Sequence, residues 1–190
     1  MAPLKQMRLG PVFAFLAACT ACPAAWAGTA EAAEISQQQV EAAYLYKFGG
    51  YVTWPDKAFA GPDSPIVIGV AGSDSVADNL TAMVTGRTIG NRPVTVKRIH
   101  EGDPLGGIHI LFIGSPRSAQ SSELFESSRG RPILVVSEGK EGLALGGAVS
   151  FVVIDERVRF DVSLDAVQEN GLKLSSQLLS VAHAVDGAGQ

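Results

Sequence analysis

The three histidines of this chain of 190 residues, His100, His109 and His183, are the first candidates for acid–base or metal chemistry. No two of them stand three or four residues apart, the spacing that puts two metal ligands on one helix face. His109 lies in an apolar run that predicts a strand, and His183 lies near the end of a predicted helix. A histidine in such a strand is more often a hydrogen-bonded structural residue than a base, so the pattern does not favour catalysis.

Sequence signatures of the common enzyme classes are missing. The chain has no Gly-x-Ser-x-Gly nucleophile turn, no Gly-x-x-x-x-Gly-Lys-Ser/Thr phosphate loop and no Gly-x-Gly-x-x-Gly after a predicted strand. We therefore expect a protein that is not an enzyme and that uses no metal and no cofactor.

Two short polar turns follow predicted strands and are candidates for binding a small ligand. One turn contains Ser73 and Asp74, and the other contains Ser115. In α/β proteins the carboxyl ends of parallel strands, together with the helix N-termini that follow them, form ligand crevices that attract anions. The alternative is that these three residues only cap helices and form turns, and both interpretations stay open.

Aromatic residues cluster in one short stretch. All three tyrosines, Tyr44, Tyr46 and Tyr51, lie close to one another and to Phe48 and Trp54. A helix cannot point Tyr44 and Tyr46 in the same direction, so we expect Tyr46 to face outward. Because tyrosine is a frequent anchor of protein interfaces, Tyr46 and Tyr51 are candidates for binding a partner. We expect the interface to include this aromatic helix and the C-terminal helical region.

Arg87 is the third candidate for partner binding, since arginine also anchors interfaces and this one follows the Gly86 that ends a predicted helix. Each candidate has an alternative interpretation. The alternative for Arg87 is a solvated surface arginine or one that pairs locally with an acid. The alternative for the aromatic stretch is a helix packed on all sides by neighbouring elements.

The elements that position these side chains follow from the spacing of apolar residues and from turn signals. Predicted helices cover residues 37–52, 73–85, 118–129, 164–169 and 174–185. Predicted strands cover residues 65–71, 94–99, 108–113 and 132–136, and a hairpin follows with arms at 149–153 and 158–162. This order predicts an α/β fold: a mainly parallel sheet sandwiched by helices, with a C-terminal antiparallel β-hairpin.

Composition favours one globular domain and argues against nucleic acid as a partner. Apolar residues make up 46% of the chain and charged residues only 18%. The formal net charge is −4, and no block of lysines or arginines supplies a surface that would neutralise phosphates.

Residues 1–27 have the features of a secretory signal peptide. Lys5 and Arg8 precede an apolar stretch, and Ala25 and Ala27 are small residues at the −3 and −1 positions of a cleavage site. The competing interpretation is a lipoprotein signal, in which Cys19 is acylated and becomes the first residue. We accordingly expect an exported protein, or alternatively one anchored to a membrane through Cys19.

The rest of the chain divides into a linker at 28–35, a folded domain at 36–185 and a loose tail at 186–190. Both cysteines, Cys19 and Cys22, precede the linker. The exported domain therefore has no thiol for a disulfide or for redox chemistry.

Several motifs in this order resemble the YfiR family of periplasmic proteins over about residues 36–185. The first is the stretch from Glu41 to Phe48 followed by Trp54-Pro55. The others lie at residues 86–94, 109–113, 130–134, 146–151, 158–163 and 171–179.

The resemblance implies a non-catalytic regulator that binds and inhibits an inner-membrane diguanylate cyclase through the periplasmic part of that enzyme. Control of cyclic di-GMP signalling and of biofilm formation would follow. A homodimer stays open as a further assembly, and the alternative function is a periplasmic domain that binds a small ligand.

Overall fold

The computed structural model describes residues 35–114, 116 and 118–187. The helices in this part are α1 (Gln37–Phe48), η1 (Asp56–Ala58, a 3-10 helix), α2 (Asp74–Val84), α3 (Ala119–Ser128), α4 (Glu141–Ala144), α5 (Leu164–Glu169) and α6 (Ser176–Ser180). The strands are β1 (Val52–Thr53), β2 (Ile66–Ala71), β3 (Thr88–Ile89), β4 (Arg92–Arg98), β5 (Ile110–Ile113), β6 (Leu134–Glu138), β7 (Val149–Ile154), β8 (Arg157–Ser163), β9 (Lys173–Leu174) and β10 (Ala184–Asp186).

One large sheet organises the domain, with the strand order β10-β8-β7-β6-β5-β2-β4-β3. The neighbours from β4 to β7 run parallel, whereas β7 and β8 form an antiparallel pair in which Phe151 lies opposite Phe160. Two edge strands were not predicted: β10 adds in parallel to β8, and β3 pairs antiparallel with β4. The predicted fold class, a mainly parallel α/β sheet with a C-terminal antiparallel hairpin, is confirmed.

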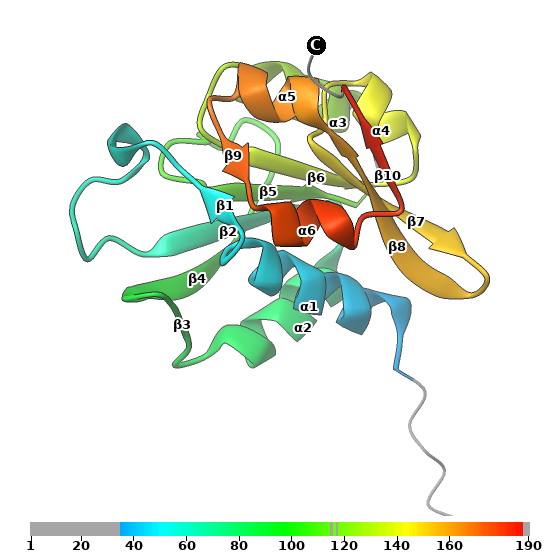
Figure 1. Cartoon of the computed structure of the whole chain (residues 1–190). Helices are drawn as coiled ribbons and strands as arrows, with labels where there is room; N and C mark the ends of the chain where they lie inside the picture. Colours follow the sequence, from blue (N-terminus) through cyan, green and yellow to red (C-terminus); the bar gives the residue numbers. More distant parts are fainter. Residues whose placement is uncertain (1–34, 115, 117, 188–190) are drawn as a thin grey trace, which may run out of the picture. The chain divides into compact units, whose positions relative to one another are not determined.

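Helices cover both faces of this sheet (Figure 1). On one face α1 and α2 pack over Ile110 and Phe112 of β5, and on the other face α3 packs over Leu111 and Ile113 of the same strand. Because successive side chains of a strand point to opposite faces, an apolar strand buried between two helix layers reads as a continuous apolar run.

The first helix is shorter than predicted, since α1 ends at Phe48 and Val52 belongs to β1. Gly49 and Gly50 follow the last helical residue, and a Cβ at Gly49 would force the Ile89 side chain to shift. The buried face of α1 consists of Glu41, Ala42, Leu45 and Phe48.

Of the predicted helix at 174–185, only Ser176–Ser180 are helical, and the rest of the prediction is wrong. Lys173 and Leu174 pair with β1, Ser175 caps the short helix α6, and Ala184–Asp186 form β10. Pairing with strands distant in sequence therefore divides a segment whose local pattern is helical. Asp186 accordingly belongs to the sheet and not to a loose tail, and residues 188–190 lie outside the described residues.

Candidate functional site

An apolar groove of about 520 Å³ lies between α1 and α6. The residues that line it are Tyr44, Lys47, Phe48, Tyr51, Phe160, Gln177, Leu178, Ser180 and Val181. The groove thus joins the aromatic stretch found in the sequence to the C-terminal segment.

Local contacts fix both walls of the groove. The Tyr51 carbonyl accepts a hydrogen bond from the Ser175 N–H at 2.9 Å, which ties the end of α1 to the start of α6. Tyr44 packs edge-on against Phe160, with ring centroids 5.5 Å apart, and Phe48 lies 5.2 Å from the same ring. These rings form a rigid floor, because Phe48 and Phe160 are buried.

The rim of the groove is exposed and apolar. Tyr51 is 37% exposed and Val181 is 61% exposed, although both are large hydrophobic side chains. Lys47 is also exposed and places one positive charge at the rim. The arrangement suits an apolar side chain of another molecule, with an acidic group beside it.

Tyr46 and Arg87 lie together at the other side of α1. The Tyr46 hydroxyl donates a hydrogen bond to the Thr88 carbonyl at 3.1 Å, and the Arg87 guanidinium carbon lies 5.8 Å from the centre of the Tyr46 ring. Tyr46 is half-buried and Arg87 is exposed. Of the three partner-binding candidates, the groove contains Tyr51, whereas Tyr46 and Arg87 form a separate contact.

The ligand-binding candidates have structural partners. The Ser73 hydroxyl accepts a hydrogen bond from the Val76 N–H and caps α2, and the Asp74 carboxylate pairs with Arg98 at 3.4 Å. Ser115 lies outside the described residues. A small-ligand site at these turns stays a prediction.

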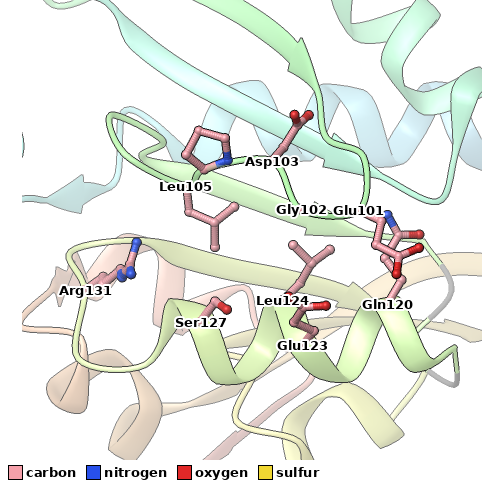
Figure 2. Close-up of a pocket in the computed structure, with 10 residues that line it drawn as sticks. Glu101, Gly102, Asp103, Leu105, Gln120, Glu123, Leu124, Ser127 and Arg131 are labelled. Atoms are coloured by element: carbon pink, nitrogen blue, oxygen red, sulfur yellow. The ribbon is translucent and has the colours of Figure 1, made fainter.

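A second hollow, of about 260 Å³, lies between the loop at 101–105 and α3. Figure 2 shows Leu105 of the loop pointing toward Leu124 of α3. Three acids, Glu101, Asp103 and Glu123, line this hollow together with Arg131, so its net charge is negative and disfavours an anion there.

The side chains of two histidines, His109 and His183, have structural partners, whereas His100 is exposed in a loop. Nδ1 of His109 accepts a hydrogen bond from the Val67 N–H at 3.1 Å, and Nε2 lies 3.2 Å from the Ala58 carbonyl. Burial lowers the pKa of His109, and the hydrogen bond to the Ala58 carbonyl raises it by a smaller amount. His183 lies between α6 and β10, with Nδ1 2.8 Å from an Asp161 carboxylate oxygen, and so does not end a helix as predicted.

Metal ligands do not gather in the part of the chain that the structure describes, where no three His, Cys, Asp or Glu side chains form a group that could hold an ion. No helix of that part combines the length and the apolar character that a membrane crossing requires.

Fold and groove together define an α/β domain that presents an apolar surface between its first helix and its C-terminal segment. The family model described as YfiR/HmsC-like matches residues 38–183, and the chain belongs to this family. Its members are periplasmic regulators of cyclic di-GMP synthesis and are not catalytic. The resemblance found in the sequence is thereby confirmed.

The sequence indicated the C-terminal helical region as part of the partner interface but singled out none of its residues that line the groove. Leu178 and Val181 fell within a predicted continuous helix, where Val181 has no distinguishing feature. The only local signal was Ser175, a capping residue in the middle of that segment.

Proposed function

We propose that this protein is an exported regulator that binds the periplasmic part of an inner-membrane diguanylate cyclase and restrains the enzyme. Membership of the YfiR/HmsC-like family supports the regulatory role. The observation that carries the binding proposal is the apolar groove between α1 and α6, with Tyr51 and Val181 exposed at its rim. Lower cyclic di-GMP and less biofilm follow from this restraint.

The groove has the properties of a binding surface for a protein. Its floor consists of packed aromatic rings, which lose little conformational entropy when a partner covers them. Its rim carries one tyrosine, one valine and Lys47, so an apolar side chain of the cyclase fits the floor while a neighbouring acid pairs with the lysine.

Val181→Asp tests this surface because it places a charge at the rim without disturbing the core. We expect the affinity for the periplasmic part of the cyclase to fall by about thirtyfold, the effect of losing a contact worth about 2 kcal/mol. Cyclic di-GMP should rise in cells that produce both proteins, while the melting temperature stays within a few degrees of wild type.

Val153→Asp is the matched control. Val153 is 56% exposed on β7 and does not line the groove, so this variant should restrain the cyclase as wild type does. Full restraint by Val181→Asp, together with an unchanged melting temperature, would show that the groove is not the interface.

A further inference from the structure

Glu41 is an acid on the buried face of α1, where its side chain has no exposed surface. One carboxylate oxygen, Oε1, accepts a hydrogen bond from the Gln37 amide at 2.7 Å. The other, Oε2, is buried and has no hydrogen-bond partner among the described residues. A buried charged oxygen without a donor is costly, so the missing donor needs a physical source.

That source is Glu138, the last residue of β6. Its side chain points to the same face of the sheet as Val136, which packs under α1. Glu138 is a neighbour of Glu41, because a hydrogen bond between the two carboxyl groups contributes to the pKa of both. Two ionised carboxylates repel when they are neighbours, but one protonated carboxyl donates to the other and gives Oε2 its donor.

The protonation state of this carboxyl pair changes near neutral pH. Burial, then the charge of Glu41 and the hydrogen bond to it, raise the pKa of Glu138 to about 7. Burial also raises the pKa of Glu41, and the hydrogen bonds with Gln37 and Glu138 lower it by a smaller amount. The folded protein therefore holds one more proton in this pair than two ordinary glutamates would near pH 6.

Few other charges act on the pair. Phe151 of β7 lies opposite Glu138 in the sheet, and no lysine, arginine or histidine in the described ranges shifts the pKa of either carboxyl. Glu156 and Arg157 of the hairpin line the hollow beside the first turn of α1, and both are exposed. Lys140 and Glu141 follow Glu138 along the chain and are also exposed. On the side of α2, Asp74 pairs with Arg98.

The first turn of α1 has room to move. A hollow of about 580 Å³ separates Ser36, Gln37 and Val40 from Val153 and Val158 of the β-hairpin. The second half of α1 is held by Leu45 and Phe48, which are buried. Hydration of a doubly ionised pair is therefore easiest if the first turns of α1 shift outward into this hollow.

We propose that Glu41 and Glu138 share one proton that holds α1 against β6, and that loss of this proton loosens α1 and weakens partner binding at the groove. This regulation rests on the proposed function, because Tyr44 and Lys47 of the groove stand on the same helix. Restraint of the cyclase is then strong at slightly acidic pH and weaker at alkaline pH.

Glu138→Gln tests the proton without the partner. The glutamine amide donates to Glu41 Oε2 and does not titrate, so it reproduces the protonated pair. In wild type we expect hydrogen-exchange protection of the α1 amides, corrected for intrinsic rates, to fall about tenfold from pH 6 to pH 8. In Glu138→Gln it should stay constant.

Glu169→Gln is the matched control, since Glu169 is exposed on α5 and the variant removes the same charge. It should follow wild type. Equal protection of wild-type α1 at both pH values, or the same fall in Glu138→Gln, overturns the proposal. Carbon NMR titration of the wild-type glutamates gives a second readout that needs no variant: one carboxyl should titrate near pH 7, and ordinary values for all of them also overturn the proposal.

Coupling to the partner is measured separately, as affinity for the periplasmic part of the cyclase at pH 6 and pH 8. Wild type should bind about tenfold more weakly at pH 8, whereas Glu138→Gln should bind equally at both. Equal wild-type binding at both pH values contradicts the coupling. Absence of binding at every pH contradicts the proposed function instead, while the exchange data still decide whether the proton is shared.

Discussion

His109 shows how burial and hydrogen bonding assign one ionisation state to a titratable residue. Its Nδ1 accepts from the Val67 N–H, so this nitrogen must be unprotonated, and Nε2–H then donates to the Ala58 carbonyl. Phe59 stacks on the ring at 4.5 Å, and the Trp54 indole donates to the His109 carbonyl. A protonated ring would lose the Val67 hydrogen bond, so the neutral form is part of the fold.

The pH dependence of stability should reveal His109. Its pKa is lowered from 6.5 in the folded state, so the unfolded chain binds the proton more readily and stability is lost as pH falls below 6.5. The raised pKa of Glu138 has the opposite sign, with stability lost as pH rises from 4.5 to about 7. Urea unfolding of Glu138→Gln at pH 5.5 and 7.5 should therefore show the His109 loss without the contribution of Glu138, with a slope of up to about 1.4 kcal/mol per pH unit.

His109→Gln in the same background is the comparison for this measurement. It should be about 1–3 kcal/mol less stable at pH 7.5, because a buried hydrogen bond is lost. Its stability should change less between the two pH values. An equal pH dependence in both proteins would assign the effect to another group.

Tyr46 gives a second prediction at the residue scale. We expect Tyr46→Ala to weaken restraint of the cyclase, because the substitution removes the ring that orients Arg87, while the domain stays folded with a loss of about 1–2 kcal/mol. Tyr46→Phe keeps the ring and removes only the hydrogen bond to Thr88, so it should restrain nearly as well as wild type. Cyclic di-GMP and the melting temperature are measured in parallel.

Two outcomes would correct this view of Tyr46. Full restraint by Tyr46→Ala would leave Tyr46 and Arg87 outside the interface. A collapse of the melting temperature would make Tyr46 a core residue, the alternative interpretation of the aromatic stretch.

At the scale of elements, local signals predicted those parts whose contacts are also local. Ser73 and Ser118 cap α2 and α3 near the predicted starts, and the β7–β8 hairpin pairs as its alternation indicates. The prediction for the C-terminal segment failed because Leu174 and Ala184 pair with other strands. The hydrogen bonds of those pairs stabilise the segment more than a continuation of a short helix would. Glu41 could have been noticed as an acid on the same helix face as Leu45, but its partner Glu138 could not.

The turn of the β7–β8 hairpin stores strain that a glycine should release. Asp155 and Glu156 both have left-handed backbones, with φ of 48° and 60°, which a two-residue hairpin turn requires and which glycine adopts more easily. Glu156→Gly should stabilise the domain by about 1 kcal/mol, raising the melting temperature by about 2–4 °C. Glu156→Ala also removes the charge but keeps Cβ, so it should not raise the melting temperature; an equal rise in both variants would assign the effect to charge.

At the scale of the whole molecule, the sheet brings together residues that sequence patterns treat as unrelated. The order of the strands puts the end of β6 under the first turns of α1, and the pairing of β1 with β9 carries α6 to the side of α1. Both the carboxyl pair and the groove therefore exist only in the complete domain. The sequence resemblance identified the family, whereas the groove proposed to bind a partner depends on this three-dimensional arrangement.

Export determines whether this domain can meet the periplasmic part of a membrane enzyme at all. Residues 1–27 and Cys19 lie outside the described residues, so their role stays a prediction from the sequence. We expect cleavage after Ala27, because Ala25 and Ala27 are small residues at the −3 and −1 positions. The apolar stretch at 11–22 is also shorter than the roughly 20 residues that a membrane-spanning helix needs. The intact mass of protein released from the periplasm should match a chain that begins at Gly28. Ala27→Gln should block this cleavage, and Cys19→Ser should leave it unchanged. A mass that shows an acylated Cys19, and that is lost in Cys19→Ser, would instead place the domain on a membrane surface.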